Sequence, residues 1–376
     1  MAIIKDEVYG TIEFNEIEER IIDTAEFQRL RRIRQMSVTN LVYPGANHTR
    51  FEHALGTAHL ASVIADKLVD DRDERAKIKL FGLLHDIGHP AFSHEGEDVL
   101  KRYIGNHEKI GKEFIQRSAV ADILNENYRA KEIADMFGSS KGMIVETDIG
   151  ADRMDYLKRD ALNTGVAYGI IDIDRLVHTM KIFEKELCIT EGGMEAAESL
   201  LVARFMMFAT VYLHKTVRIA TAMLQRAIEC AIEEGAMAPE DFIWIGDDVG
   251  YWRMVESKAA RPYAEGLLKR RLYKEITEIP EKSMSEKKAK AIEKEMSEKF
   301  GCDIIFDYPT PFSKSVGLNV LLKNGKRVPL IELSDLVSSL ADAEKRRRKI
   351  LVLAKEEDKK RYGDLIAKTL AGLSEQ

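Results

Sequence analysis

Long stretches of this 376-residue chain contain almost no helix-breaking residue, and this feature constrains its fold most. Only 8 prolines occur, and many segments are rich in Ala, Leu, Glu, Lys and Met, the residues that lose least entropy in a helix. Residues 53–69 place apolar side chains near a helical period, and residues 76–86 form an apolar run that stops at Gly-His-Pro. The sequence therefore predicts a mainly α-helical protein, with one long or two stacked buried helices over 196–233.

The character of the chain changes after about residue 235. Residues 280–299 have the charge pattern of a solvated helix, with Glu and Lys at helical neighbours. Strands are predicted for three segments: 302–312, 317–333 with a hairpin turn at Asn324-Gly325, and 350–354. We therefore predict a helical catalytic core at 1–235 and a smaller α+β extension at 236–376, which would make oligomer or regulatory contacts.

Composition and charge argue against several classes of protein. The formal net charge of −6 gives no general attraction to nucleic acid or to acidic membranes. No apolar stretch approaches the roughly 20 residues of a membrane span, and the acidic first residues do not resemble a signal peptide. The three cysteines are odd in number and far apart, which favours a reducing compartment. We expect a cytoplasmic protein that binds neither membranes nor nucleic acid.

The histidines are strongly clustered. Nine occur in the chain, and seven of them fall within residues 48–107. The pair His85-Asp86 ends an apolar helical segment, where a carboxylate is unfavourable unless it is paired or coordinates a cation. Imidazole nitrogen with carboxylate oxygen suits Zn, Fe or Mn better than Ca. A pair offers only two ligands, and His53 and Asp152 are the natural candidates for the others.

Three other histidines have simpler interpretations. A single histidine in an apolar helix is more often a hydrogen-bonded core residue than a ligand, so we expect this role for His59 and His178. His48 follows Pro44-Gly45 and is expected to be a turn residue.

Four motifs occur in a fixed order along the chain. They are IIDTAEFQRLRRIRQ at 21–35, YPGANHTRFEHALG at 43–56, HDIGHPAFSH at 85–94 and DRMDYLKRD at 152–160. Together they resemble the deoxynucleoside triphosphate triphosphohydrolases of the HD superfamily, most closely the branch that also has a SAM domain, but without that domain. The resemblance covers about residues 5–235 and continues more loosely through 267–276. It implies attack at the α-phosphorus, with release of a nucleoside and intact triphosphate.

The resemblance implies four metal ligands: His53, His85, Asp86 and Asp152. Two histidines and two carboxylates would hold one divalent ion (Fe, Mn, Zn, Ni or Mg) and leave positions open for water.

The resemblance also implies a catalytic group of His94, His89, His107 and Glu97. His94 would donate a proton, because a 5′ alkoxide is a poor leaving group. Glu97, three residues later on the same helix, would orient the His94 ring, while His89 and His107 would contact phosphate.

Substrate-binding residues follow from the same matches. Phosphate contacts are expected from Arg50, Arg153 and Arg204, since a triphosphate requires several converging cations. The sugar is expected to contact Gln35, Met36, Tyr156, Asp160 and Tyr212. Asp160 would accept a hydrogen bond from the 3′ hydroxyl, and Tyr212 would pack against the 2′ carbon. Leu213 stands where the family has a Gln that contacts the sugar, so a polar contact is lost.

The resemblance also implies a homo-oligomer, either a dimer or a tetramer, and a site for a nucleotide activator. Asp23, Gln28 and Arg31 match a nucleotide activator site of the family, whose members are commonly homodimers or tetramers. Two alternatives to the triphosphohydrolase stay open: a nucleotidase or phosphodiesterase acting on nucleoside monophosphates or cyclic nucleotides, and a non-catalytic nucleotide sensor. Convergence of the three arginines beyond the metal would favour the triphosphate.

Overall fold

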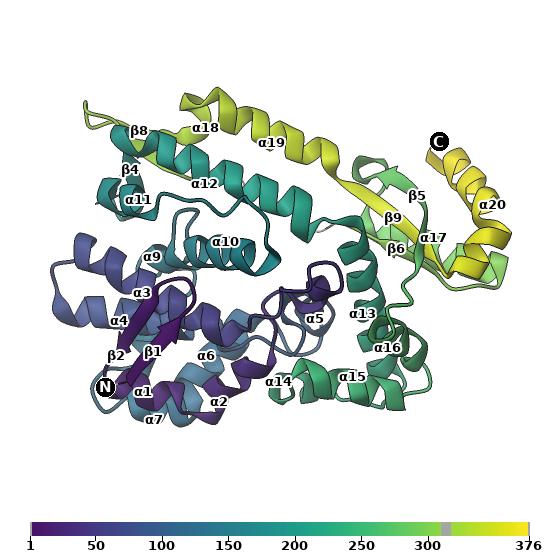
Figure 1. Ribbon diagram of the computed structural model, residues 1–376, viewed down its shortest axis with the longest axis horizontal. Helices are drawn as coiled ribbons and strands as arrows, with labels where there is room; N and C mark the ends of the chain where they lie inside the picture. Colours follow the sequence, from purple (N-terminus) through teal and green to yellow (C-terminus); the bar gives the residue numbers. More distant parts are fainter. Residues whose placement is uncertain (1, 310–316, 375–376) are drawn as a thin grey trace.

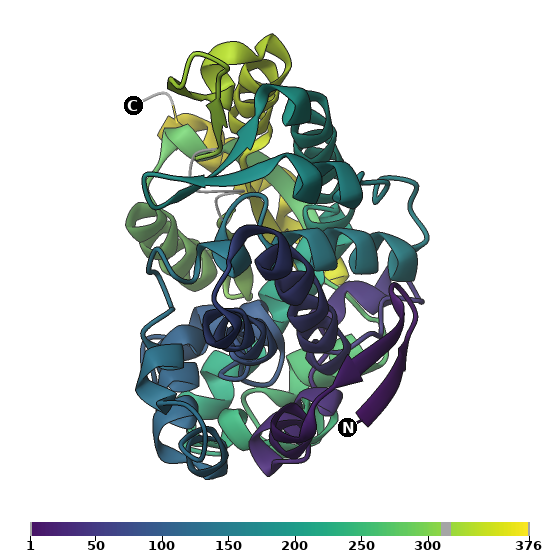
Figure 2. The same ribbon diagram turned by 90° about the vertical axis from the view of Figure 1, so that its left-hand side faces the viewer.

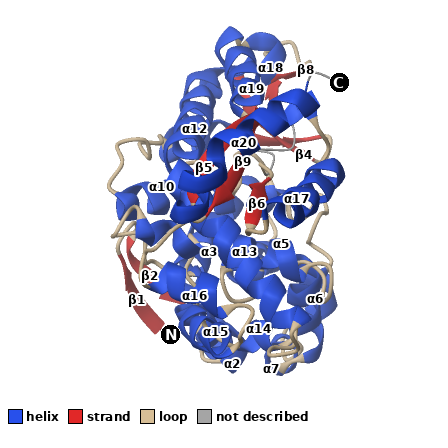
Figure 3. Ribbon diagram, turned by 90° about the vertical axis from the view of Figure 1, so that its right-hand side faces the viewer, coloured by secondary structure: helices blue, strands red, loops and turns tan. Residues whose placement is uncertain are grey.

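The computed structural model describes residues 2–309 and 317–374, and most of these residues are helical (Figures 1 and 3). The α-helices are α1 Glu16–Ile22, α2 Ala25–Gln28, α3 Arg50–Leu68, α4 Arg72–Leu84, α5 Ser93–Leu100, α6 His107–Arg117, α7 Ala119–Leu124, α8 Ala130–Ala134, α9 Met143–Glu146, α10 Ala151–Thr164, α11 Ile173–Thr179, α12 Met194–Met207, α13 Lys215–Glu233, α14 Asp241–Trp244, α15 Asp247–Glu256, α16 Arg261–Leu268, α17 Glu286–Phe300, α18 Leu330–Leu333, α19 Asp335–Arg347 and α20 Glu356–Ser374. The strands are β1 Ala2–Asp6, β2 Gly10–Phe14, β3 Met180–Phe183, β4 Glu186–Thr190, β5 Lys274–Pro280, β6 Ile304–Asp307, β7 Asn319–Leu321, β8 Arg327–Pro329 and β9 Lys349–Ala354. The predicted mainly α-helical fold is confirmed.

Helices α3 and α4 pack side by side, and α10 packs against α3 (Figure 1). Helix α3 begins at Arg50 because the Glu52 carboxylate accepts a hydrogen bond from the backbone N–H of Thr49, the residue before the helix. Helix α4 ends at Leu84, so His85 is the first residue beyond it. The three helices thereby bring the segments with the predicted metal ligands together.

The apolar segment 196–233 forms two helices rather than one. Helices α12 and α13 are separated by a single π-helical turn over Phe208–Tyr212. Among the described residues no single helix is long and apolar enough to cross a membrane. The two consecutive segments 191–212 and 215–233 meet that criterion only as a pair, and they bend by 64° at the break.

The C-terminal part contains a three-stranded antiparallel sheet in the order β5-β9-β6. Alternate residues of its strands point to opposite faces. Ile350 and Val352 contact one hydrophobic cluster with α17 and α20, while Leu351 and Leu353 contact another with α13. Burial on both faces explains why the predicted strand at 350–354 is a continuous apolar run.

The second sheet has the order β3-β4-β7-β8 and contains the predicted hairpin at Asn324-Gly325. The predicted strand over 317–333 extends too far, because the strand stops at Pro329 and α18 follows. Proline has no N–H to donate to a neighbouring strand, so the ladder ends there. The predicted strand at 302–312 is shorter in the structure, where β6 ends at Asp307, and its residues 310–312 lie outside the described residues.

The N-terminal hairpin β1–β2, which the sequence analysis did not predict, lies against the helical core at the opposite end from α18 and α19 (Figure 2). The proposed division near residue 235 stays a prediction. One hydrophobic cluster contains Val38 and Phe92 from the first part together with Met237 and Leu353 from the second. The two parts therefore share a core.

The substitution Gly82→Ala tests the packing of α3 against α4. The added methyl group would lie 2.9 Å from the Ala61 Cβ and 3.2 Å from the Ala58 Cα, so the helices must separate. We expect the free energy of unfolding to fall by about 1–3 kcal/mol. The matched control is Gly363→Ala in α20, where the nearest atom is a flexible Lys359 side-chain carbon at 3.5 Å.

The control should leave stability unchanged or raise it by about 0.5–1 kcal/mol, because alanine favours a helix over glycine. Urea denaturation followed by circular dichroism measures both proteins. Equal stability of Gly82→Ala and the unsubstituted protein would contradict the close packing.

Candidate metal centre and active site

Four side chains from three distant segments meet in the helical core. His53 and Asp152 lie in the first turns of α3 and α10, and His85-Asp86 follows α4 directly. The Nε2 atom of His53 lies 3.2 Å from Asp152 Oδ1 and 3.4 Å from Asp86 Oδ2. The Nε2 atom of His85 lies 3.7 Å from Asp152 Oδ1 and 3.5 Å from Asp86 Oδ1. The four predicted metal ligands are thus close neighbours.

The arrangement suits a divalent cation. The buried Nε2 atoms of His53 and His85 have no hydrogen-bond partner among the described residues, which is costly for buried polar atoms. Burial opposes a charge on His53, but its close contacts with the carboxylates of Asp152 and Asp155 and the nearby charge of Asp86 raise its pKa to about 10. Carboxylates that favour a proton on this ring would also favour a metal cation in its place. Nitrogen and carboxylate donors together fit Zn, Fe, Mn or Ni.

The opposite nitrogens of both rings are already engaged. The Nδ1 atom of His85 lies 2.8 Å from the Gly82 carbonyl oxygen and must donate to it. The Nδ1 atom of His53 lies 2.8 Å from Asp155 Oδ2. These contacts orient each ring with Nε2 directed toward the carboxylates of Asp86 and Asp152, as is usual for metal-binding histidines.

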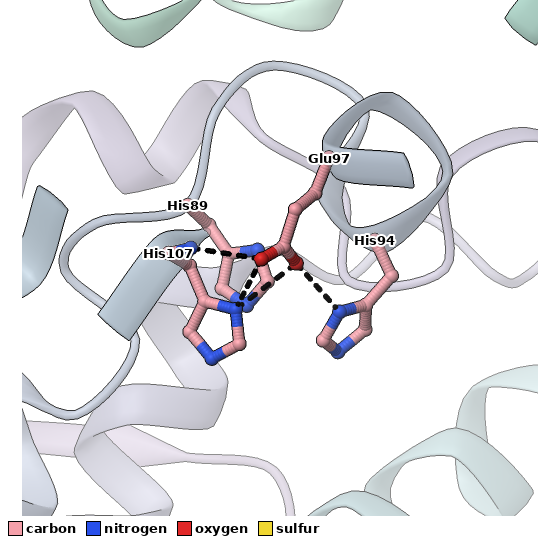
Figure 4. A group of neighbouring side chains, drawn as sticks. All are labelled: His89, His94, Glu97 and His107. Carbon is pink, nitrogen blue, oxygen red and sulfur yellow. Dashed lines mark hydrogen bonds and ion pairs between the residues drawn. The ribbon is translucent and has the colours of Figure 1, made fainter. Parts of the chain in front are cut away.

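A second group, the histidine group, comprises His89, His94, Glu97 and His107 (Figure 4). Its central member is Glu97, which lies 3.2 Å from His94 Nδ1 and accepts a 2.8 Å hydrogen bond from the backbone N–H of His107. The same carboxylate lies 3.0 Å from His107 Nδ1, a contact that the sequence analysis did not anticipate. Figure 4 shows Glu97 between the two rings, so a single carboxylate orients both histidines.

His89 connects the histidine group to the predicted ligands. Its Nε2 atom lies 3.3 Å from Asp86 Oδ1, and its ring stacks on that of His107 with 4.0 Å between centroids. Burial and the positive charge of Arg50 hold the pKa of His89 well below its usual value. His89 is therefore neutral, and it brings no additional positive charge to the centre.

The three arginines predicted to contact phosphate lie at two different positions. The Arg50 guanidinium donates to Asp86 Oδ2 and to Ser93 Oγ. Arg153 donates to Asp148, and an Arg204 nitrogen lies 3.7 Å from the same carboxylate oxygen. Two of the three arginines thus meet at the carboxylate of Asp148, a residue that was not predicted from the sequence.

Two side chains hold Asp160, one of the predicted sugar residues. Tyr212 donates its hydroxyl hydrogen to Asp160 Oδ2, and His48 Nε2 lies 2.7 Å from Asp160 Oδ1. The Gln35 N–H donates to the His48 carbonyl oxygen, and Met36 is buried beside Gln35. Tyr156 is half-buried against the same core.

Three of the simpler interpretations can be checked. His48 does lie in a loop, but its side chain is buried and holds Asp160, so a turn role alone is wrong. His59 is half-buried against Tyr9, with 5.0 Å between ring centroids. His178 is exposed near the end of α11, so the core role predicted for it is wrong.

The residues that match an activator site also lie together. Arg31 donates a 3.0 Å hydrogen bond from Nε to Gln28 Oε1, and Gln28 donates to the Ile22 carbonyl oxygen beside Asp23. Their binding of a nucleotide stays a prediction.

Known families match both halves of the chain. The family model of the HD domain matches residues 50–160, and that of the HD associated region matches residues 171–375, more than half of the chain. An uncharacterised protein from Methanocaldococcus jannaschii is 37% identical over 95% of this chain and 80% of its own length. The chain belongs to the HD-domain phosphohydrolases.

Two further relatives bear on the activity of this HD-domain protein. It is 26% identical to the deoxynucleoside triphosphate triphosphohydrolase SAMHD1 homolog of Dictyostelium discoideum, over 74% of this chain but only 60% of that relative. A solved structure of a phosphohydrolase from Bacteroides thetaiotaomicron superposes with a TM-score of 0.78 at 26% identity, covering 95% of this chain and all of that one. The predicted membership of the HD superfamily is therefore confirmed.

In this HD-domain protein a series of buried ion pairs holds His53 on its Nδ1 side, opposite the candidate metal ligands. Arg159 donates to both oxygens of Asp155, at 3.0 and 2.9 Å. Arg159 also donates a 2.9 Å hydrogen bond to Asp6, the last residue of β1. These residues were not predicted from the sequence, although Asp155 lies three positions after Asp152, the spacing that puts both on one side of a helix. The N-terminal hairpin is thereby tied to the candidate metal centre.

The substitution Asp155→Asn tests whether this support serves metal binding. Losing the carboxylate that orients His53 should lower metal affinity by about 10- to 100-fold. Competition with a chromophoric chelator, with Mn²⁺ or Co²⁺ as the probe, measures the affinity, and circular dichroism checks the fold. Asp122→Asn, at an exposed carboxylate on α7, is the control. Equal affinity of the Asp155 variant and the control would contradict a supporting role.

Proposed function

We propose that this HD-domain protein hydrolyses deoxynucleoside triphosphates at the α-phosphorus and releases a nucleoside and intact triphosphate. The observation that carries the proposal is the meeting of Arg153, which follows Asp152 in α10, with Arg204 at Asp148, together with the contact of Arg50 with Asp86. These three guanidinium groups suit a substrate with about four negative charges, because Arg binds phosphate oxygens in a forked geometry. The similarity to a triphosphohydrolase from Dictyostelium supports the same substrate class.

Different residues of the chain would bind the metal, donate the proton and orient the donor. When bound by His53, His85, Asp86 and Asp152, a divalent ion would supply Lewis-acid activation of water and phosphate. His94 would donate a proton to the 5′ oxygen as its bond to phosphorus breaks. Glu97 contacts the Nδ1 side of His94, so the Nε2 side is the one that would donate.

Sugar recognition would rest on Asp160. Its carboxylate would accept a hydrogen bond from the 3′ hydroxyl, and Tyr212 would lie against the 2′ carbon. His48 and Tyr212 hold the two oxygens of Asp160 in place, so this acceptor is already oriented before a sugar binds. Preorganisation of this kind reduces the ordering needed on binding.

A second candidate function is a nucleotidase or phosphodiesterase that acts on nucleoside monophosphates or cyclic nucleotides. The observation that favours it is Asp148, whose negative charge offsets one of the two arginines at their meeting point. A smaller net positive charge suits a substrate with fewer phosphates.

A product assay separates the two functions. With Mn²⁺ present, we expect dGTP to yield deoxyguanosine and triphosphate, identified by chromatography and phosphorus NMR. The control is Asp86→Ala, which should lose bound metal and activity while remaining folded. Release of a nucleoside monophosphate and pyrophosphate would contradict the proposed bond. Turnover of dGMP or a cyclic nucleotide without turnover of dGTP would favour the second function.

The substitution His94→Ala tests the proton donor. It should leave metal content unchanged and lower kcat on dGTP by about 10²- to 10⁴-fold, because the 5′ oxygen would leave unprotonated. Metal analysis and steady-state kinetics measure the two effects. His178→Ala removes an exposed histidine and serves as the matched control. A His94→Ala rate equal to that of the control would assign proton donation to another group.

A further inference from the structure

Two consecutive residues before His94 have an unusual backbone conformation. Phe92 has φ 66° and Ser93 has φ 55°, both in the left-handed region. This region is unfavourable for any residue with a Cβ, and most of all for a bulky one. Such conformations persist only where the surroundings hold them, and they cluster at functional sites. Here the turn begins α5, the helix that carries His94 and Glu97.

A single buried carboxylate holds this turn through the backbone. Asp247 Oδ1 accepts a 2.7 Å hydrogen bond from the Phe92 N–H, and Oδ2 accepts a 3.0 Å bond from the Arg34 N–H. Asp247 is only 2% exposed. Ser93 adds a second link to the same residue, since its hydroxyl donates to the Arg34 carbonyl oxygen at 2.6 Å. Both residues of the turn are therefore linked to the Arg34 backbone: Phe92 through Asp247, and Ser93 directly.

The Phe92 side chain is held as firmly as its backbone. Its buried ring meets Tyr251 edge to face, with 5.0 Å between centroids, and packs on Gly250. A Cβ at Gly250 would lie 2.7 Å from two atoms of the ring. The Ala91 N–H donates to the Phe242 carbonyl oxygen at 2.8 Å. Thus α14 and α15, far from His94 in the sequence, enclose the turn.

We propose that Asp247, together with Gly250, is a positioning residue for hydrolysis. It holds the left-handed Phe92–Ser93 turn, so that His94 stands where it can protonate the leaving oxygen. The inference rests on the proposed role of His94. The hydrogen bonds of Asp247 go to the backbone N–H groups of Phe92 and Arg34. Its effect would therefore pass through the turn and through the Arg34 backbone to which Ser93 is bonded.

Two substrates distinguish positioning from general structural support. A deoxynucleoside triphosphate needs a proton on its leaving oxygen, whereas bis(p-nitrophenyl) phosphate releases a phenolate that is stable without one. For Asp247→Asn we expect kcat on dGTP to fall by about 10- to 100-fold, because displacement of a reacting group by about 1 Å has effects of that size. The KM for dGTP, the bound metal and the rate on bis(p-nitrophenyl) phosphate should stay within about threefold of the unsubstituted protein.

Two further variants complete the test on the full-length protein. Gly250→Ala pushes a methyl group against the Phe92 ring and should reproduce the pattern of Asp247→Asn without touching the carboxylate. Asp248→Asn, at the adjacent carboxylate whose side chain is 83% exposed, is the matched control and should act as the unsubstituted protein does.

Several results would overturn the inference. An equal loss on both substrates would assign Asp247 a purely structural role, and an unchanged kcat on dGTP for both Asp247→Asn and Gly250→Ala would remove it from catalysis. Failure of the proposed function is seen separately, as the absence of deoxyguanosine and triphosphate from the unsubstituted protein, and the inference would then fall with it.

Discussion

The buried ion pair between Asp155 and Arg159 is the contact on which the geometry of the candidate centre depends. Both side chains are fully buried in α10, where a lone charge would be very unfavourable. Two parallel hydrogen bonds join them, and Asp6 and His53 occupy their remaining polar atoms. Gly56 in α3 makes room for the pair, because a Cβ there would lie 2.0 Å from Asp155 Oδ1. The pair thus fixes the distance between α3 and α10, and with it the distance between His53 and Asp152.

The candidate metal ligands and the histidine group differ in their balance of charge. The group of His53, His85, Asp86 and Asp152 contains two carboxylates and would attract a cation. The histidine group beyond it is arranged around a single carboxylate, Glu97, whose pKa the hydrogen bonds from His107 and His94 lower despite burial. Arg50 contacts Asp86 from one side, and His89 lies between Asp86 and His107. A site with a cation on one side and a proton donor on the other suits cleavage of a phosphate ester.

How far the sequence predicts this site depends on the kind of contact. His53, His85, Asp86 and Asp152 were predicted because their side-chain chemistry is unusual for its surroundings and the motifs that contain them are specific. The helices were predicted because their period is local. His48 was misjudged because a loop position does not determine where a side chain points, and Asp160 lies 112 residues away. The strand predicted to run to residue 333 ends at Pro329. Proline ends the hydrogen bonding between β8 and β7, and this pairing cannot be read from the local sequence. Asp148 and Asp247 carry no motif, and only tertiary structure places them.

The candidate site draws residues from both regions that match known families. The region that matches the HD model, 50–160, contains the four candidate ligands and the histidine group. Arg204 and Tyr212, the predicted terminal-phosphate and sugar contacts, and the Asp247 and Gly250 that enclose the Phe92–Ser93 turn belong to the HD associated region. Metal chemistry would then reside in the HD domain, while substrate binding and alignment of the proton donor would depend on both regions. Arg50 and Arg153 lie in the HD domain and Arg204 lies in the associated region, so the contacts that would hold a triphosphate come from both matched parts of the chain.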